Sequence, residues 1–581
     1  MSKATAHFLP DDVWVTVKKG CTIAAAAQAA MIDLPLPCGG RGACGKCTVF
    51  ANGRPVRACA ALLEEDMTIH VPDAVRLTGQ TVLTDIRAYD AGRNRAPLVE
   101  QARIEMAPPS LEDSVSDATR VKMALARHLD VRPERVRIEE ASLASLPGKL
   151  RDGNFKITAN LFYEDEGVTV LSFSSKPLYG VAIDIGTTTV VTALCDLATG
   201  FVLDTIGIPN PQAEYGADVI SRIVYTEENE NGAKTLQEAV LGVMRSSISI
   251  LAQRAGIPAA GIPVMTVAAN TVMVHFLLNL PTYWLRREPY VPAACEFPTL
   301  RPADLAMPIM PNGRVVILPA VSSYVGGDIT AGLIATDLAA RPGLNMLVDV
   351  GTNGEMVLAG DGFMIACSCS AGPAFEGSGI SHGSRAVHGA IDNVYYHKGH
   401  MVYDVIGGYN AEARSLCGSG LISFLSALLQ KGVIDRSGRF TTEEKEFFVA
   451  DGVSITQDDV FNIIRAKAAI YAGIRVLVKS VDMSLSDIDH IFIAGGFGRH
   501  LNIGYATNIG MLPPLPLESF SYAGNTSLSG ALRVLNDRTI DAGSVAAAVT
   551  NLELSVGNQF MEEFTMASFL PHTELDFYKA V

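Results

Sequence analysis

The spacing of hydrophobic and polar positions predicts short strands around one helix in the N-terminal part of the chain. The run Val13–Val17 alternates between apolar and polar positions, which is typical of a half-buried strand. The alanine-rich run 22–31 has the composition of a helix. Strong periodicity is then lost, which is typical of a linker. We therefore predict a first domain over residues 1–80 and a linker over residues 81–100.

A second pattern of elements covers residues 101–177. Ser116 or Asp117 can cap a helix that runs to Asp130. Two β-rich runs, FKITANLFY and VTVLSF, follow and flank the turn-forming sequence EDEG. This order of elements predicts a small α+β domain, and its sequence contains no group of residues that suggests chemistry. We interpret it as a connector domain.

The rest of the chain repeats one pattern on a large scale. An apolar strand runs into an Asp-x-Gly turn at 181–188, and another strand does so at 346–354. Each turn is followed by further strands and helices, so we predict one domain over 178–581 with two related lobes, about 178–345 and 346–581. A nucleotide would bind between the lobes.

Composition narrows the class of protein. At 581 residues the chain is too long for one hydrophobic core, because such cores stop growing at roughly 250–300 residues. The formal net charge of −15 argues against nucleic-acid binding, which rewards clustered Lys and Arg. No apolar stretch reaches the roughly 18 residues that a spanning helix needs, and the N-terminus lacks an export signal. We expect a cytoplasmic protein without membrane or nucleic-acid partners.

Four cysteines lie in and just after a glycine-rich loop. Cys38, Cys44, Cys47 and Cys59 have the spacing C-x5-C-x2-C-x11-C. Clustered thiols in a reducing compartment bind metal more often than they form disulfides, and this loop followed by a fourth cysteine is the plant-type arrangement of iron–sulfur ligands. A zinc ribbon would need two C-x2-C pairs, and only Cys44 and Cys47 form one. We predict a 2Fe-2S cluster on the four thiolates, with zinc or simple thiols as the alternatives.

Most other cysteines are scattered, but Cys367 and Cys369 are only two positions apart in ACSCSAGPAFEGSG. A role in redox chemistry is open for this pair. Burial as small core residues is the more common role of such cysteines.

The two Asp-x-Gly turns, DIGTTT from Asp184 and DVGTNGE from Asp349, have the composition of phosphate-binding turns. An aspartate can hold Mg²⁺ directly or through water, while backbone N–H groups and threonine hydroxyls can surround phosphate oxygens. A third glycine-rich turn, IAGGFGRH, follows at 493–500. A single turn is weak evidence because ordinary β-turns share this composition, but the ordered set of three favours a nucleotide site.

The order of these turns resembles the phosphate-1, phosphate-2 and adenosine motifs of the superfamily of acetate and sugar kinases, heat-shock chaperones and actin. Within this superfamily the chain resembles the reductive activators of corrinoid proteins, which are ATPases that carry a ferredoxin domain. The similar stretches are NPQAEYGADVISRI (210–223), AANTVMVHFLL (268–278), PAVSSYVGGDITAG (319–332), CSAGPAFEGSGISHGSRA (369–386), SLCGSGLI (415–422), IRAKAAIYAGI (464–474) and IAGGFGRHLN (493–502). The resemblance extends over the whole chain, including the cysteine loop and the connector.

The resemblance implies a multidomain α/β fold. An N-terminal β-grasp domain of the 2Fe-2S ferredoxin type and a small α+β connector would precede a C-terminal two-lobed, actin-like ATPase domain. The candidate catalytic residues are Asp184, Asp349 and Glu355. The candidate cofactor-binding residues are Gly186, Thr187, Thr188, Gly351, Thr352, Asn353, Gly495 and Gly496. Gly326, Gly327 and Asp328 also lie in stretches similar to the family.

The implied activity is ATP-dependent reduction of Co(II) to Co(I) in a corrinoid methyl-carrier protein of a methyltransferase system. The implied cofactors are a 2Fe-2S cluster and ATP with Mg²⁺. The electron transfer needs coupled free energy, because the reduction of Co(II) to Co(I) takes place at a very negative potential, whereas plant-type clusters lie at about −400 mV. Each ~59 mV of adverse difference in potential costs a factor of ten in the equilibrium constant. A low-potential ferredoxin, flavodoxin or reductase would supply the electron. The sequence does not identify these partners, and it leaves open whether the chain forms a homodimer.

Three other functions share some of these features. A sugar or acetate kinase would share the two lobes but would have no use for the cysteine loop. The ATP-dependent activators of 2-hydroxyacyl-CoA dehydratases also join this fold to iron–sulfur chemistry, but they bridge a cluster between two subunits. A non-enzymatic iron–sulfur subunit would use the C-terminal domain only for docking, and the two phosphate turns argue against an inert domain.

Overall fold

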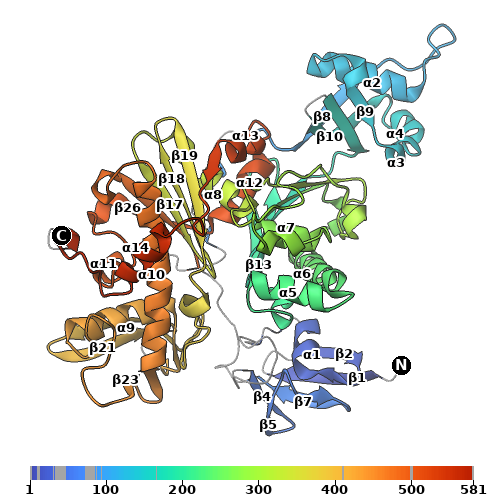
Figure 1. Ribbon diagram of the computed structural model, residues 1–581. Helices are drawn as coiled ribbons and strands as arrows, with labels where there is room; N and C mark the ends of the chain where they lie inside the picture. The colour runs from blue at the N-terminus through green and yellow to red at the C-terminus, as the bar shows by residue number, and fades with distance from the viewer. Residues whose placement is uncertain are drawn as a thin grey trace.

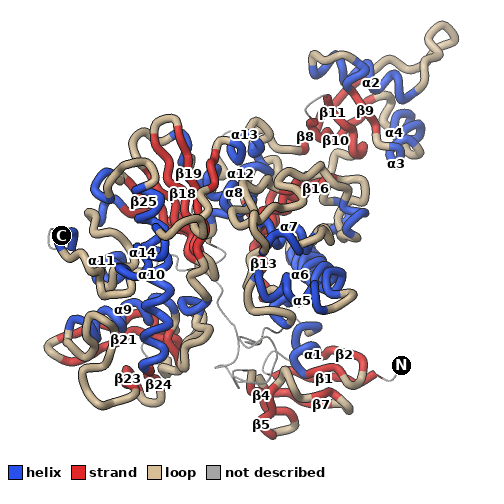
Figure 2. The backbone as a smooth tube through the Cα atoms, in the orientation of Figure 1, coloured by secondary structure: helices blue, strands red, loops and turns tan. Residues whose placement is uncertain are grey.

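The protein is built from two small units and one large two-lobed body. The computed structural model describes residues 3–9, 13–30, 32, 34, 47–71, 85–86, 88–92, 95–164, 167–407, 411–496 and 501–578. Figure 1 shows the N-terminal unit below the first lobe and the second small unit above it. Each of these bodies mixes helices and strands (Figure 2). The predicted multidomain α/β architecture is confirmed.

The N-terminal unit is a five-stranded sheet covered by one helix. Its elements are β1 (Lys3–Leu9), β2 (Val13–Lys18), β3 (Cys21–Thr22), α1 (Ile23–Ala29), β4 (Thr48–Ala51), β5 (Arg54–Arg57), β6 (Leu62–Leu63) and β7 (Met67–His70). The strand order is β2-β1-β7-β4-β5, with β1 and β7 parallel at the centre. Alternate residues Ala4, Ala6 and Phe8 are fully buried, because successive side chains of a strand point to opposite faces. This is the predicted β-grasp arrangement.

The second small unit has a four-stranded sheet in the order β8-β10-β11-β9. Its elements are β8 (Val99–Glu105), α2 (Asp117–Leu129), β9 (Val136–Ile138), α3 (Glu140–Leu143), α4 (Leu146–Asp152), β10 (Lys156–Glu164) and β11 (Gly167–Phe173). Ser116 caps α2, because its side chain accepts a hydrogen bond from the Thr119 backbone N–H at 3.1 Å. The predicted helix and strand pair are therefore confirmed.

Part of the segment that we predicted as a linker is attached to the large two-lobed body. The backbone oxygen of Asp85 accepts a hydrogen bond from the Asn525 backbone N–H at 2.8 Å. The Arg95 guanidinium donates to the Ala198 carbonyl at 2.9 Å. The described residues between 85 and 98 thus lead the chain along the large body toward β8.

The two lobes contain sheets of the same topology. The first sheet, in the order β14-β13-β12-β15-β16, consists of β12 (Tyr179–Ile185), β13 (Thr189–Asp196), β14 (Val202–Pro209), β15 (Val264–Ala269) and β16 (Arg314–Ile317). The second, in the order β26-β25-β17-β18-β19-β27, consists of β17 (Asn345–Val350), β18 (Gly354–Gly360), β19 (Phe363–Cys369), β25 (His490–Gly495), β26 (Phe520–Gly524) and β27 (Val549–Asn551). In each sheet an antiparallel meander of three strands continues into two parallel strands. The predicted relation between the lobes is confirmed.

Helices and two small sheets surround these large sheets. The helices of the two lobes are α5 (Val219–Glu228), α6 (Gly232–Arg254), α7 (Thr271–Leu277), α8 (Gly327–Thr336), α9 (Gly418–Gln430), α10 (Gln457–Lys479), α11 (Ile503–Asn508), α12 (Thr526–Asn536), α13 (Ala542–Ala547) and α14 (Gln559–Ala567). The small sheets consist of β20 (Ala390–His397), β21 (His400–Val405), β22 (Ser415–Leu416), β23 (Glu446–Ala450) and β24 (Val453–Thr456). Within the described part of the chain, no helix is both long enough and apolar enough to cross a bilayer.

Helix α12 connects the lobes. It follows strand β26 of the second lobe but packs on β12 and β15 of the first, beside α8 (Figure 1). A Cβ atom at Gly530 would lie 2.0 Å from the Ala331 carbonyl oxygen, so only glycine allows the two helices to approach this closely. The Thr266 hydroxyl donates to the Ala531 carbonyl at 2.9 Å. This packing brings the N-terminus of α12 to the end of β12.

Candidate nucleotide and cluster sites

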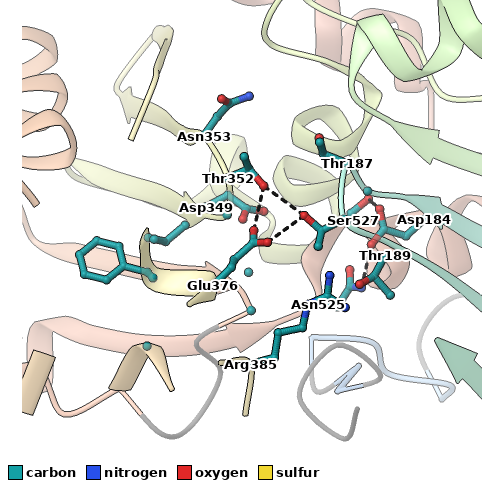
Figure 3. Close-up of a pocket in the computed structure, with 18 of the residues that line it drawn as sticks. Asp184, Thr187, Thr189, Asp349, Thr352, Asn353, Glu376, Arg385, Asn525 and Ser527 are labelled. Carbon is teal, nitrogen blue, oxygen red and sulfur yellow. Dashed lines mark hydrogen bonds between the residues drawn. The ribbon is translucent and has the colours of Figure 1, made fainter. Parts of the chain in front are cut away.

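A pocket opens between the lobes where β12 and β17 end (Figure 3). Ligands of open α/β sheets commonly bind at such carboxyl ends of strands. All of the predicted nucleotide-site residues line this one pocket: Asp184, Gly186, Thr187, Thr188, Asp349, Gly351, Thr352, Asn353, Glu355, Gly495 and Gly496. Asp328 lines it as well. The structure thus brings together segments from both lobes, and the roles of the individual residues remain predictions.

Asp184 is oriented by residues from the opposite end of the chain. Its two carboxylate oxygens accept hydrogen bonds from the Asn525 side-chain amide and the Ser527 hydroxyl, both at 2.8 Å. Burial raises the pKa of Asp184 to about 6, although these two hydrogen bonds oppose the rise. The carboxylate is thereby held in one orientation, with free lone pairs for further donors such as metal-bound water.

Three more carboxyl groups line the same pocket, with Glu355 buried and Asp328 and Asp349 partly buried. Burial and the charge of Asp184 raise the pKa of Asp349 to about 7. Burial, followed by the charges of Asp349 and Asp184, raises the pKa of Asp328 to about 7. The pKa of Glu355 is also raised, by burial and then by the charges of Asp328 and Asp349. Buried like charges favour a bound cation, because a divalent ion removes their repulsion.

The donor set fits magnesium that is bound mainly through water. Among the residues that the structure describes, no group of three His, Cys, Asp or Glu side chains converges closely enough to hold a metal ion. Mg²⁺ usually keeps several water ligands and takes only one or two carboxylates plus substrate phosphates. Asp184 and Asp349 lie at the ends of two strands on either side of the pocket and can hold these waters.

The third predicted turn lies directly against the second. Gly495 has φ of +92°, and a Cβ atom there would lie 2.6 Å from the Asp349 carboxylate and 2.5 Å from the Val350 carbonyl oxygen. Only glycine fits this position without displacing Asp349. Gly495 and Gly496 line the pocket, whereas residues 497–500 of the IAGGFGRH turn lie outside the described residues.

A buried arginine supports the first phosphate turn. Arg222 is fully buried, and its guanidinium donates to the carbonyl oxygens of Thr187 at 2.6 Å and Gly216 at 3.0 Å. Burial lowers the pKa of Arg222 to about 10, while the charges of Asp218 and Glu376 act in the opposite direction. The guanidinium therefore stays protonated and places a positive charge behind the turn that contains Thr187.

Glu376 joins the two phosphate turns. Thr188 of the first lobe donates to one of its carboxylate oxygens at 2.8 Å, and Thr352 of the second lobe donates to the other at 2.9 Å. The two threonine hydroxyls are 3.2 Å apart. Glu376 ends the short 3-10 helix Pro373–Glu376 and points toward Thr352 in Figure 3.

Two of the predicted cluster ligands lie within the described residues. The Sγ atoms of Cys47 and Cys59 are 3.3 Å apart, with Cys47 buried beneath the sheet and Cys59 half-buried. Two thiolates on one tetrahedral metal ion, with bonds of about 2.3 Å, are about 3.8 Å apart, so a small adjustment fits this pair to a shared iron. Cys38 and Cys44 lie outside the described residues. Cys47 and Cys59 therefore fit the predicted cluster.

Cys367 and Cys369 lie on strand β19 in the core of the second lobe. Both are buried in the main hydrophobic cluster of that lobe. Burial raises the pKa of Cys369 to about 12 and raises that of Cys367 strongly. Reactive cysteines need thiolate character, so this environment supports the packing role that we gave as the alternative to redox chemistry.

Comparisons with known proteins assign the chain to a family. The 2Fe-2S iron-sulfur cluster binding domain matches residues 3–73, the RACo linker region 89–176, the RACo middle region 179–341, and the C-terminal ASKHA domain of RACo 343–581. The solved structure of a reductive activator for corrinoid, iron-sulfur protein is 38% identical, covers 100% of both chains and superposes with a TM-score of 0.78. The chain belongs to the RACo family.

Two further proteins are similar to this chain over much of their length. The corrinoid activation enzyme RamQ of Eubacterium limosum is 28% identical over 579 residues, which cover 92% of this chain and 94% of RamQ. The [Co(II) methylated amine-specific corrinoid protein] reductase of Methanosarcina barkeri is 25% identical over 414 residues, which cover 64% of this chain and 73% of the reductase. The family predicted from the sequence motifs is confirmed, together with its 2Fe-2S and ASKHA domains.

The pocket of this RACo-family chain contains residues that sequence reasoning missed. Asn525 and Ser527 follow strand β26 and reach Asp184 only through the packing of α12. Arg222 and Glu376 lie in stretches that had been noted as similar to the family, NPQAEYGADVISRI and CSAGPAFEGSGISHGSRA. Their place in these stretches was the available signal, but neither residue has a spacing that indicates phosphate chemistry.

The buried carboxyl groups predict how the stability of this RACo-family protein depends on pH. A carboxyl whose pKa rises from its ordinary value to about 7 on folding binds more protons in the folded state, so it lowers stability progressively as pH rises between those values. We expect the Tm of the nucleotide-free, Mg²⁺-free protein to fall by several degrees from about pH 5 to about pH 8. Asp349→Asn should reduce this fall, as should added Mg²⁺. An Asp349→Asn protein with the wild-type pH profile of Tm would contradict the raised pKa of Asp349.

Proposed function

We propose that this protein uses ATP to drive the one-electron reduction of Co(II) to Co(I) in a corrinoid protein. The observation that carries the proposal is the end-to-end match with a reductive activator in a chain that joins a cysteine-rich domain to a two-lobed phosphate pocket. The relatives described as a corrinoid activation enzyme and as a Co(II) corrinoid protein reductase support the same substrate class. The domain boundaries predicted above remain part of this proposal.

Cys38, Cys44, Cys47 and Cys59 would hold the cluster. Bound there, it would supply one-electron chemistry at about −400 mV. Cys47 is buried beneath the sheet and Cys59 is half-buried beside it, so the chain anchors one side of the site in its own core. A low-potential ferredoxin, flavodoxin or reductase would donate the electron.

The residues around the pocket have separable roles in this proposal. Asp184 and Asp349 would hold a hydrated Mg²⁺ ion, and Glu355 would add negative charge to the same pocket. The hydroxyls of Thr187, Thr188 and Thr352, with Asn353, would bind the phosphates. Gly186 and Gly351 would shape the two turns, because their N–H groups donate to the carbonyl oxygens of Thr189 at 3.0 Å and Asn353 at 2.9 Å. Gly495 and Gly496 leave room for the nucleoside.

ATP can supply free energy to the electron transfer because it contacts both lobes. A ligand shifts a conformational equilibrium only by its differential affinity for the two states. Polyphosphate bound by threonines of both lobes would favour the arrangement in which those turns face one another. If that arrangement binds the Co(II) partner with a different affinity from the other arrangement of the lobes, nucleotide turnover is coupled to the reduction.

The remaining features of the proposal concern the setting of the protein. We place it in the cytoplasm, where clustered thiols stay reduced. Its partner is a corrinoid methyl carrier of a methyltransferase system. A homodimer is compatible with this function but is not required by it.

A panel of corrinoid proteins tests the proposal. The anaerobically reduced protein is mixed with several Co(II) methyl-carrier proteins, with Mg-ATP, with Mg-ADP or without nucleotide, and the Co(I) absorption band is followed. We expect Co(I) to appear only with Mg-ATP and with at least one carrier. Absence of Co(I) across the panel, despite an intact cluster and measurable ATP binding, would contradict the proposal. It would favour an activator of the dehydratase type or an electron-transfer subunit.

A further inference from the structure

The Glu376 carboxylate is hydrogen-bonded to both phosphate turns. It receives the Thr188 hydroxyl at 2.8 Å and the Thr352 hydroxyl at 2.9 Å. The two donors belong to different lobes and to the two turns predicted to bind phosphate. A single carboxylate thus bridges the two lobes.

This arrangement cannot coexist with a polyphosphate that uses the same hydroxyls. A hydroxyl group has one proton and donates one hydrogen bond. While Thr188 and Thr352 donate to Glu376, neither can donate to a phosphate oxygen. A phosphate placed between them would also lie beside the carboxylate, and like charges at such distances repel strongly.

The surroundings of the carboxylate are suited to an anion. The buried guanidinium of Arg222 stands behind the first turn, and its electrostatic interaction with Glu376 is favourable. Arg385 and the first residues of helix α9, Gly418 and Ser419, line the same pocket. A guanidinium and a helix N-terminus both favour negative charge. Among the carboxyl groups of the pocket, Glu376 is the one that accepts hydrogen bonds from both Thr188 and Thr352.

We propose that the Glu376 carboxylate occupies the place of a terminal phosphate group in the nucleotide-free protein, and that ATP must displace it to bind. The inference rests on the proposed function in one respect, namely that ATP binds in this pocket. Phe375, the preceding residue, is buried in the core of the second lobe, so the Glu376 side chain turns away while its helix stays in place. Glu376 is therefore a competitor of ATP, and its removal strengthens ATP binding.

Glu376→Gln tests the proposal because it removes the charge and keeps the shape. Isothermal titration should give a Mg-ATP affinity about tenfold tighter than that of the wild type, which corresponds to about 1.4 kcal/mol. The affinity for AMP, which lacks the terminal phosphates, should stay unchanged. Glu376→Asp, which keeps the charge but has a shorter reach, should give an intermediate tightening of Mg-ATP binding.

Two further variants separate competition from general effects. The carboxylate of Glu446 on β23 accepts a hydrogen bond from the Ser454 hydroxyl at 3.0 Å, much as Glu376 does from its threonines. Glu446→Gln is therefore a matched control that should leave ATP affinity unchanged. In a Thr188→Val background the gain from Glu376→Gln should become smaller, because one of the two contested donors is gone. The cluster spectrum and the Tm of each variant verify folding.

The outcomes are distinct. Equal or weaker Mg-ATP binding by folded Glu376→Gln overturns the proposal and would assign Glu376 a supporting role in nucleotide binding or none. Equal tightening of ATP and AMP also overturns it, because competition is then not with the terminal phosphates. Failure of the wild-type protein to bind Mg-ATP at all would instead refute the nucleotide site on which the proposal rests.

Discussion

Asp349→Asn should abolish Mg²⁺-dependent ATP hydrolysis, with a loss of roughly a hundredfold or more in kcat. Asp349 is partly buried at the end of β17, where it lines the pocket together with Asp184. Asparagine has nearly the same shape, so the fold should survive, but it carries no charge to hold metal-bound water. ATP hydrolysis is measured as phosphate release over a range of Mg²⁺ concentrations.

A matched aspartate on the same sheet gives the control for this experiment. Asp361 is exposed in the turn between β18 and β19, so Asp361→Asn should keep wild-type ATP hydrolysis. The absorption spectrum of the cluster should be unchanged in both variants, because the cysteines lie in the N-terminal unit. An Asp349→Asn protein that retains full hydrolysis would remove Asp349 from the site.

Cys59→Ser should give the opposite phenotype. Its sulfur lies 3.3 Å from that of Cys47, and loss of one of four thiolates should prevent stable cluster assembly. We expect loss of the iron–sulfur absorption and at least a hundredfold slower formation of Co(I), with ATP hydrolysis changed by no more than about twofold. Spectra of anaerobically reconstituted protein and the Co(I) assay measure the two effects.

Cys21→Ser provides the comparison for the cluster variant. Cys21 belongs to the same N-terminal unit but lies on β3, paired with Leu63, and is not one of the spaced ligands. We expect this variant to keep both the cluster and the activation of the corrinoid partner. If Cys59→Ser retained the cluster spectrum, the ligand set read from the C-x5-C-x2-C-x11-C spacing would be wrong.

Local signals made much of the fold predictable. Ser116 caps α2 within the bounds expected, because capping depends on neighbouring residues alone. The strands that end near Asp184 and Asp349 were predictable for a similar reason, since an apolar run followed by a glycine turn specifies both. The N-terminal helix is shorter than predicted, Ile23–Ala29 rather than 22–31, because alanine content does not specify where a helix ends.

Long-range packing accounts for what the sequence did not reveal in the pocket. Asn525 reaches Asp184 only because α12 crosses to the first lobe, and that crossing depends on the close contact at Gly530. Glu376 and Thr188 belong to different lobes, so no local pattern relates them. Arg222 was hidden for another reason, because a charged residue on an amphipathic helix is usually assigned to the exposed face.

The hydrogen bond between Asp85 and Asn525 fixes the point at which the chain from the N-terminal unit joins the large body. The N-terminal unit ends near Val71, and residues 72–84 separate it from this attachment point. Even a fully extended chain of that length spans at most about 50 Å. A domain confined to that radius meets any protein docked on the large body at an effective concentration on the order of millimolar. Under the proposed function, the encounter between the electron carrier and cobalt would therefore need little affinity of its own.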